Sequence, residues 1–345
     1  MKPVRIGSER YGYVRVGYGL PCTVMAEVGL NHDGDVEKAL KLVELAARAG
    51  AGLVKFQYID PTAMVHRESM PELYSLYNKY ALSLPEMERV ARACMSNKIP
   101  FVTTVFDLEG ASRMVEIGVC AFKVASCDMT HLPLLKGLGS FGLPVILSTG
   151  LADLAEAARS VRALKKGGCR TPILLHCVSA YPAPPDAVNL TAMLAMQSKF
   201  KLPVGYSDHT RGTLAPALAA VLGAVLVEKH FTYDPQAQGP DHALSLGPEE
   251  FRQMVEEVRL AGAMRGDGRK KCSEAERKER TVGRRGYYLK RNVKQGEKVS
   301  LDDLIALKPW TEIGPFNSLR GACYAKDLLA GSPLNSGDIF FPEKD

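Results

Sequence analysis

Short apolar runs alternate with amphipathic stretches between about residue 20 and residue 264. Eight runs have the length and composition of buried strands, and they cover residues 23–28, 53–57, 101–105, 121–124, 145–148, 173–177, 204–206 and 225–230. Apolar strands that are each followed by a helix favour a parallel sheet covered on both faces. Eight such units predict an α/β protein with a (β/α)8 TIM barrel, although an open doubly wound sheet shows the same alternation.

Two of the stretches between the runs show the helical pattern clearly. In 36–49 the predicted apolar face holds Val36, Leu40, Val43 and Ala47, and in 249–264 it holds Phe251, Met254, Val255 and Val258. Residues 4–19 alternate in the manner of a hairpin that covers one end of the barrel. Two long segments, 58–84 and 179–190, follow strands, where a barrel places its substrate-binding loops.

The pattern changes after residue 264. We predict a barrel domain with its hairpin over residues 1–264, a basic linker over 265–283 and a small β-rich domain over 284–345. The last domain contains strand-like pieces at 286–289 and 304–307. A module of this size has a limited core, so it is expected to lean on the barrel or on a partner chain.

Charge and cysteine content narrow the possible functions. The net charge is +6, but residues 265–291 carry +7 by themselves, so a basic nucleic-acid-binding face is not expected. No apolar run is long enough to span a bilayer and no signal peptide is recognisable, which predicts a soluble cytoplasmic protein without membrane contacts. The eight cysteines include no Cys-x-x-Cys pair, and Cys120 and Cys177 are interpreted as reduced core residues.

Polar side chains follow nearly every predicted strand at its carboxyl end, where barrel active sites are built. The residues are Glu27, Lys55, Thr103 and Thr104, Lys123, Ser148, His176, Ser207 with His209, and Glu228 with His230. Isolated buried polar groups would not be expected to recur at eight equivalent positions. The sequence therefore predicts one active site at this end of the barrel.

His209 and His230 end neighbouring strands, so two neutral imidazoles could share a divalent cation and leave positions open for water and substrate. Glu228 precedes His230 by two residues and shares its face of the strand, whereas Lys229 should point toward the helices. A single buried histidine is more often a hydrogen-bonded core residue than a ligand. The paired arrangement favours the metal site.

Lys55 and Lys123 follow apolar residues on two strands, and a buried lysine needs an anionic partner. With Thr104, Ser126, Ser148 and Ser207, these lysines could bind a phosphate and a carboxylate. The alternative is a Schiff-base aldolase or lyase, in which one lysine attacks a carbonyl. That chemistry requires no metal, so the histidine pair argues against it.

The same residues resemble, in order, the sialic acid synthase family. The matching segments are Ala26-Glu27-Val28-Gly29-Leu30-Asn31-His32-Asp33-Gly34, Lys55-Phe56-Gln57, Lys123-Val124-Ala125-Ser126, Leu147-Ser148-Thr149-Gly150, His176-Cys177, Tyr181-Pro182, Gly205-Tyr206-Ser207-Asp208-His209-Thr210, Glu228-Lys229-His230-Phe231-Thr232 and Gly239-Pro240-Asp241. The tail, with Arg284-Arg285 and 293–297, resembles the antifreeze-like (SAF) domain that ends those enzymes.

This resemblance implies a metal-dependent transferase that condenses phosphoenolpyruvate with an N-acetylated amino-sugar aldehyde, such as N-acetylmannosamine, to give a sialic-acid-type nine-carbon keto acid and phosphate. It implies that phosphoenolpyruvate is bound by Lys55, Thr104, Lys123, Ser126, Ser148 and Ser207. It implies that His209 and His230 bind Mn²⁺ or Mg²⁺ and that Glu27 and Glu228 act in catalysis. The sugar would be contacted by Tyr181, Asp241 and Lys308. It also implies a domain-swapped homodimer.

The chain departs from the family pattern where the acceptor sugar is expected. Residues 64–80 form a shorter segment than in many members, Cys127 stands where glycine is common, and Lys308-Pro309-Trp310 replaces an arginine-containing motif. Either another residue such as Arg320 takes over the contact, or the acceptor is a modified or phosphorylated sugar. A non-catalytic sugar- or ice-binding protein is a third hypothesis, which does not explain the polar strand ends.

Overall fold

The structure, a computed structural model, describes residues 2–342, so residue 1 and residues 343–345 at the ends of the predicted domains lie outside it. The chain forms two compact units that divide between Asp267 and Gly268.

In the first unit, eight parallel strands close into a barrel in the order β10-β3-β4-β5-β6-β7-β8-β9. They are β3 Thr23–Glu27, β4 Leu53–Gln57, β5 Phe101–Thr104, β6 Ala121–Val124, β7 Val145–Ser148, β8 Ile173–Cys177, β9 Val204–Asp208 and β10 Leu226–His230. The predicted (β/α)8 barrel is confirmed, and the open-sheet alternative is excluded by the pairing of β10 with β3.

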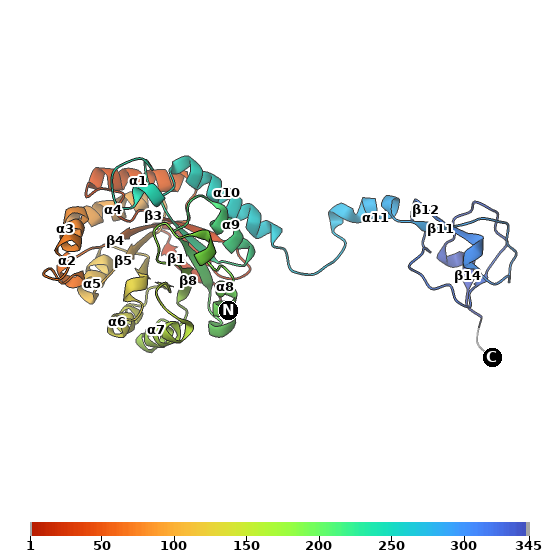
Figure 1. Cartoon of the computed structure of the whole chain (residues 1–345), viewed down its shortest axis with the longest axis horizontal. Helices are drawn as coiled ribbons and strands as arrows, with labels where there is room; N and C mark the ends of the chain where they lie inside the picture. Colours follow the sequence, from red (N-terminus) through yellow and green to blue (C-terminus); the bar gives the residue numbers. More distant parts are fainter. Residues whose placement is uncertain (1, 343–345) are drawn as a thin grey trace. The chain divides into compact units, whose positions relative to one another are not determined.

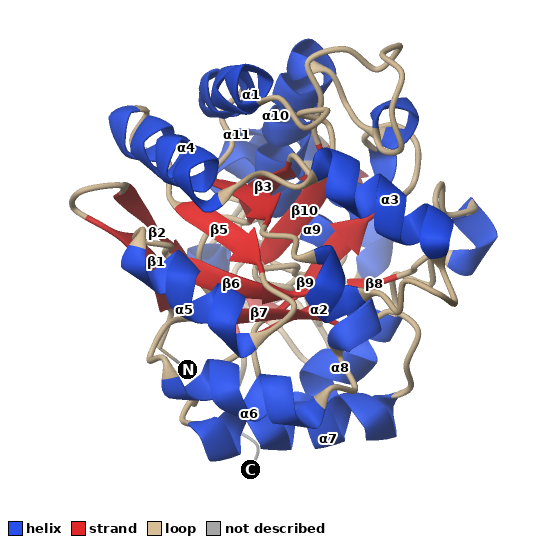
Figure 2. Ribbon diagram, turned by 90° about the vertical axis from the view of Figure 1, so that its left-hand side faces the viewer, coloured by secondary structure: helices blue, strands red, loops and turns tan. Residues whose placement is uncertain are grey.

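Helices surround the strands as an outer ring, which Figures 1 and 2 show from two directions. They are α1 Val36–Arg48, α2 Pro61–Met64, α3 Pro71–Tyr80, α4 Leu84–Ser96, α5 Leu108–Glu116, α6 Leu132–Ser140, α7 Leu154–Gly167, α8 Ala192–Phe200, α9 Leu214–Val221 and α10 Pro248–Met264, with short 3₁₀ turns η1 Ser126–Asp128, η2 Pro185–Ala187 and η3 His242–Leu244. Segment 58–84 thus contains two short helices before α4.

The apolar faces of these helices pack on the outside of the barrel. Helix α10 buries Phe251, Met254, Val255 and Val258 as predicted. Helix α1 buries Ala39, Leu42, Val43 and Ala46, so only Val43 of its predicted face is fully inside. The other three predicted residues are half-buried, because the buried face of the helix is formed by Ala39, Leu42, Val43 and Ala46.

The N-terminal hairpin closes the amino end of the barrel. Strands β1 Val4–Ser8 and β2 Gly12–Val16 pair antiparallel. Between them, Tyr11 donates through its hydroxyl to the Ile117 carbonyl at 3.4 Å, and the Arg10 carbonyl accepts from Lys98 Nζ at 3.2 Å. Lys98 and Ile117 precede β5 and β6, so the predicted hairpin lies opposite the carboxyl end of the barrel.

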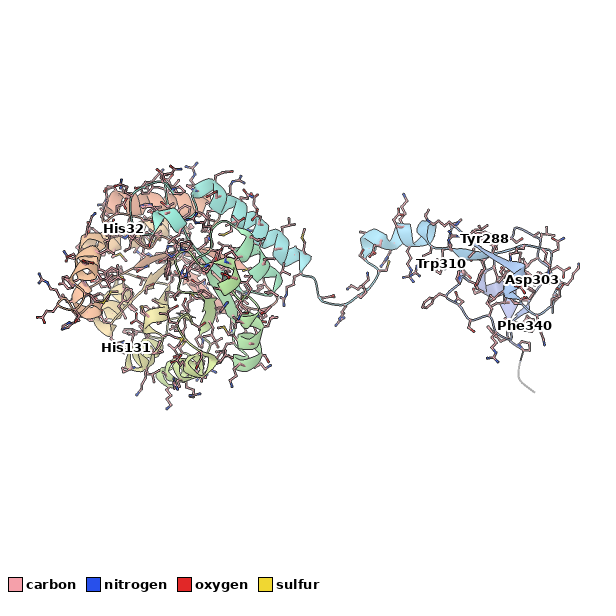
Figure 3. The ribbon with its side chains drawn as sticks, viewed as in Figure 1. His32, His131, Tyr288, Asp303, Trp310 and Phe340 are labelled. Atoms are coloured by element: carbon pink, nitrogen blue, oxygen red, sulfur yellow. The ribbon has the colours of Figure 1, made fainter. Side chains whose placement is uncertain are left out.

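The second unit contains η4 Glu274–Glu276, α11 Arg277–Gly283, β11 Gly286–Leu289, η5 Leu301–Asp303, β12 Leu304–Leu307, β13 Cys323–Tyr324, η6 Ser336–Asp338 and β14 Ile339–Phe340. The predicted strands at 286–289 and 304–307 pair with each other, and a small core gathers around Tyr324 and Leu334. Tyr288, labelled in Figure 3, donates to the Pro309 carbonyl at 3.1 Å within this unit. Its assignment as an antifreeze-like domain stays a prediction.

Across residues 2–342, every helix falls short of the length and apolar character that crossing a bilayer requires.

Candidate active site

A cavity of about 370 Å³ lies at the carboxyl end of the barrel. All twelve predicted site residues of the barrel line it: Glu27, Lys55, Thr104, Lys123, Ser126, Ser148, Tyr181, Ser207, His209, Glu228, His230 and Asp241. Each of the eight strands, or the loop that follows it, contributes at least one lining residue. The alternation of side chains along each strand brings these groups into one volume.

Lys55 is the central cation of the cavity floor. Its Nζ lies 2.8 Å from Glu27 Oε2 and 3.1 Å from Glu228 Oε1, and it donates to Thr104 Oγ1 at 3.1 Å. The three charged side chains are at most 6% exposed. Burial lowers the pKa of Lys55, but attraction to Glu228 and Glu27 outweighs this effect and raises it. Lys55 is therefore held as an ammonium between two carboxylates.

Lys123 is the second buried cation and has a different environment. Its Nζ donates to Ser148 Oγ at 2.7 Å and to the Val124 carbonyl at 3.1 Å, and lies 3.6 Å from Glu228 Oε2. Burial lowers the pKa of Lys123, and the attraction to Glu228 offsets it only in part. Glu228 Oε2 has no hydrogen-bond partner, so this oxygen can still accept a hydrogen bond from a bound molecule.

Close backbone approach shapes the loop after β7. The Gly150 amide donates to Ser126 Oγ at 3.1 Å. A Cβ at Gly150 would lie 2.8 Å from that oxygen and 2.4 Å from Ser179 Oγ, so any larger residue there would displace both hydroxyls. Ser179 Oγ is buried without a hydrogen-bond partner. The hydroxyls of Ser126, which lines the cavity, and of Ser179 therefore meet at Gly150.

His209 and His230 lie side by side, with ring centroids 5.6 Å apart. The Val178 carbonyl, 2.7 Å from His209 Nδ1, can only accept a hydrogen bond, so Nδ1 carries the proton and Nε2 keeps its lone pair. His230 Nδ1 is buried without a hydrogen-bond partner and lies 3.8 Å from Asp241 Oδ2. Burial lowers the pKa of His230, which favours the neutral ring that a metal ion needs.

These features fit a divalent cation bound by two imidazoles, with a backbone acceptor orienting one ring. Within residues 2–342, no cluster of three or more histidine, cysteine, aspartate or glutamate side chains has metal-binding geometry, so water and substrate would supply the remaining ligands. Burial lowers the pKa of His209, but interaction with Cys177 and the Val178 carbonyl raises it by more. A bound cation would lower the pKa of His209, because it repels the proton of the charged ring.

Asp241 reaches the cavity from the loop after β10. Its Oδ2 accepts from the Leu30 amide at 3.0 Å. Gly29 beneath it has φ +54°, and a Cβ there would lie 2.5 Å from the same oxygen, so the glycine makes room for the carboxylate. Tyr181 comes from the loop after β8, and the centroid of its ring lies 4.2 Å from the centroid of the His209 ring. The two predicted sugar-contacting residues of the barrel, Tyr181 and Asp241, thus lie beside the histidine pair.

Two strand-end residues do not join the cavity. His176 bonds to the Val188 carbonyl at 2.8 Å instead, and Thr103 is fully buried without lining the cavity. The neighbouring Cys177 lines the cavity with Sγ 3.9 Å from His209 Nδ1, which corrects its interpretation as a plain core residue. Since neighbouring strand residues point in opposite directions, His176 and Cys177 cannot both face inward.

The sequence interpretation missed several lining residues. Gln57 donates through Nε2 to Glu27 Oε1 at 2.8 Å, and its position two residues after Lys55 was the available signal. The outer lining is mostly apolar or aromatic, and its members come from loops whose course the pattern does not determine: Leu30, Tyr77, Phe106, Pro240 and Leu244. Cys127, noted as a departure, also lines the cavity. Lys308 is an exposed residue of the second unit.

Fold and cavity together define a barrel enzyme whose polar site lies at the carboxyl ends of its strands. Residues 42–270 match the NeuB family, and the chain belongs to this family. It is 42% identical over 309 residues to uncharacterized protein MJ1065 of Methanocaldococcus jannaschii, with 90% of each chain covered. It is 37% identical over 349 residues to N,N'-diacetyllegionaminic acid synthase of Legionella pneumophila, covering 95% of this chain and 98% of the relative.

The solved structure of N-acetylneuraminic acid (sialic acid) synthetase from Leptospira borgpetersenii matches with a TM-score of 0.73 and 34% identity, covering 81% of this chain and 95% of the other. The predicted resemblance to sialic acid synthases is therefore confirmed. The chain is related to enzymes that make sialic and legionaminic acids and act on small molecules.

Proposed function

We propose that this protein condenses phosphoenolpyruvate with an N-acetylated amino-sugar aldehyde, giving a nine-carbon keto acid and inorganic phosphate. The observation that carries the proposal is the convergence of twelve predicted residues on one cavity that combines two lysines, two carboxylates, several hydroxyls and a histidine pair. Relatives over nearly the full length bear the names of such synthases, which supports the reaction class.

The lysine side of the cavity suits phosphoenolpyruvate. Lys55 and Lys123 are ammonium donors, and Thr104, Ser126, Ser148 and Ser207 add hydroxyls around them. A phosphate and a carboxylate need several donors with fixed directions, which this set provides. Glu228, paired with both lysines, holds them in place in the absence of substrate, and the bound anion would share their charge.

The histidine side suits the aldehyde. A divalent cation held by His209 and His230 would supply positive charge for the aldehyde oxygen, which becomes negative as the carbon–carbon bond forms. Tyr181 and Asp241 lie next to these rings and would orient the sugar. Whether Mn²⁺ or Mg²⁺ is preferred does not alter the roles of these side chains.

Glu27 is the proposed proton carrier. Its two oxygens contact Lys55 and Gln57, which fix its direction toward the cavity. The terminal enol carbon of phosphoenolpyruvate attacks the aldehyde carbon, and water adds to the carbon that carries the phosphate ester. Glu27 accepts one proton from this water and passes it to the sugar oxygen, and the second water proton leaves with the phosphate as the keto group forms.

The acceptor is proposed to be unphosphorylated. Among the cavity-lining residues that the structure describes, Lys55 and Lys123 are the only lysines, no arginine is present, and both lysines lie on the floor. The lining residues that come from loops and from α3 are mostly apolar or aromatic, among them Leu30 and Tyr77, and Asp241 adds negative charge. A phosphorylated sugar would place its anion there without a lysine or arginine from the barrel itself. Apolar contacts suit acetyl or deoxy substituents.

Lys308 and the swapped homodimer remain part of the proposal through family resemblance. The second unit would reach the cavity of a partner chain and place Lys308 near the N-acetyl group of the sugar. An amine is a point donor rather than the fork of a guanidinium, so the contact would differ from that of an arginine.

A Schiff-base aldolase is the second candidate, and the lowered pKa of Lys123 favours it. The proposed function is tested by phosphate release from phosphoenolpyruvate with a panel of amino sugars, with and without Mn²⁺. The aldolase is tested by borohydride reduction in the presence of pyruvate. A covalent adduct on Lys123 would support the second candidate, and phosphate release without an adduct would support the first.

A further inference from the structure

A fully buried ion pair lies on the outer face of strands β9 and β10. Lys229 Nζ is 2.5 Å from Asp208 Oδ2, and both side chains are 0% exposed. The two residues are direct partners in the parallel register, as are Glu228 and Ser207 one position earlier. Neither Lys229 nor Asp208 lines the cavity, so this pair takes no direct part in binding substrate.

The pair lies directly behind the histidines. Side chains alternate along a strand, so the inward direction of Ser207 and His209 leaves Asp208 on the outer face. In the same way, Glu228 and His230 face the cavity while Lys229 faces the helices. Each member of the ion pair is therefore the immediate chain neighbour of one predicted metal ligand.

Hydrogen bonds to Asp208 also fix the backbone on both sides of His209. Asp208 Oδ1 accepts from the Tyr206 hydroxyl at 2.9 Å and from the Thr210 amide at 2.9 Å, and Oδ2 accepts from Thr210 Oγ1 at 3.1 Å. Lys229 Nζ also donates to the Thr210 carbonyl at 2.5 Å. His209 is thus held between two fixed residues, and the same network reaches the residue before His230.

Stability alone does not explain such a pair. Removing two charges from water is costly, and apolar residues of similar volume often replace a buried ion pair without loss of stability. What apolar residues do not supply is direction, since their contacts allow small shifts of one strand along another. A charged pair with five hydrogen bonds fixes one register and one separation of the two strand ends.

We propose that Lys229 and Asp208 are positioning residues that set the separation of His209 and His230 and thereby the affinity of the site for a divalent cation. This inference rests on the proposed function, in that it takes the histidine pair as the cation site. The pair acts through the backbone: it keeps two imidazoles within the few tenths of an ångström that a shared ion tolerates.

The test uses the full-length protein and the double variant Lys229→Met/Asp208→Asn. Both charges are removed together, and the asparagine keeps an acceptor for the Thr210 amide, so the fold is expected to survive with a melting temperature within a few degrees of wild type. The dissociation constant for Mn²⁺, measured from the electron paramagnetic resonance signal of the free ion, is expected to rise at least about tenfold. Saturating Mn²⁺ should restore most of kcat, which a general loss of structure would not allow.

Two controls separate the possible outcomes. The exposed pair Lys294–Asp327 in the second unit, changed to Lys294→Met/Asp327→Asn, should leave Mn²⁺ affinity unaltered. His230→Ala should abolish Mn²⁺ binding; if it does not, the cation site of the proposed function is wrong, whatever the ion pair does. If Mn²⁺ affinity in Lys229→Met/Asp208→Asn stays within about threefold of wild type, the positioning role is wrong.

If the double variant does not fold, Lys229→Arg decides the question. The guanidinium keeps the charge but cannot occupy the same point between Asp208 and the Thr210 carbonyl. Weaker Mn²⁺ binding by a folded Lys229→Arg protein supports the positioning role, and unchanged binding overturns it.

Discussion

His242 Nε2 lies 3.0 Å from Asp33 Oδ1, a contact that joins the loop after β3 to the loop after its neighbour β10. Asp33 Oδ2 also accepts from Lys38 Nζ at 2.7 Å and from the Tyr233 hydroxyl at 2.8 Å. His242 follows Asp241 directly, and His32, labelled in Figure 3, precedes Asp33 in the first of these loops. The contact therefore fixes the loop that delivers Asp241 to the cavity.

Asp33→Asn is expected to destabilise the protein by about 1–2 kcal/mol, because three donors lose a charged acceptor. Asparagine tolerates the left-handed backbone of this residue, φ +57°, so the loss comes from the side chain. Urea unfolding measures the difference. Asp327→Asn at the surface of the second unit is the matched control, and an equal loss in both variants would contradict the prediction.

The same carboxylate predicts a pH dependence. Burial raises the pKa of Asp33, but hydrogen bonds from Lys38, His242 and Tyr233 lower it by more, so its pKa in the folded protein is below the ordinary value. Its contribution is present above the unfolded-state pKa of about 3.9 and is lost as the pH falls through the folded-state pKa. The stability gap between wild type and Asp33→Asn should thus shrink steadily below about pH 4. A gap that is constant from pH 7 to pH 3 would refute this.

Lys55→Met is expected to cost about 3–5 kcal/mol of stability, because Glu27 and Glu228 would lose their shared counter-ion while remaining buried. It should also weaken phosphoenolpyruvate binding by more than tenfold. Calorimetric titration and urea unfolding measure the two effects. Ser148→Ala, which removes one hydroxyl beside Lys123, should weaken binding with little change in stability, and a larger stability loss there than in Lys55→Met would be unexpected.

The apolar mouth predicts acceptor choice. Phosphate release should be at least about tenfold more efficient, in kcat/KM, with N-acetylated hexosamines that carry no phosphate than with their 6-phosphates, because a buried anion without a cation is costly. Tyr77→Lys should narrow this ratio by placing a cation at the mouth. Equal or better use of the phosphorylated sugars by the wild-type protein would show that the acceptor assignment is wrong.

Lys308→Ala tests the proposed contribution of the second unit. The KM for the sugar should rise several-fold while the KM for phosphoenolpyruvate stays unchanged, since only the acceptor is expected to meet this residue. Lys298→Ala, another exposed lysine of the unit, is the control. An unchanged sugar KM would remove Lys308 from the site.

Much of the barrel follows from sequence because its strands are short, continuous apolar runs. Four predicted strands agree with the structure to the residue, including β4 and β8. The predicted run for β9 ended two residues too early, because Ser207 and Asp208 are polar and do not continue the apolar pattern. Asp208 is buried only because Lys229 of the next strand neutralises it, a relationship between distant residues that periodicity does not reveal.

The site was predictable to the extent that it follows strand alternation. Residues at strand ends, such as Lys55 and Glu228, converge as expected, and Lys229 points outward as predicted. His176 was misplaced because β8 presents Cys177 to the cavity instead. Tyr77 was missed because it lies on α3, inside a long segment whose path depends on packing rather than on local pattern.

The central claim is tested most directly by one measurement: phosphate released from phosphoenolpyruvate by the full-length protein with N-acetylmannosamine-type acceptors and Mn²⁺, before and after excess chelator. The account predicts one phosphate for each nine-carbon keto acid formed and loss of both products with the chelator. Undiminished turnover in the presence of chelator, or the absence of phosphate release with every acceptor, would contradict it.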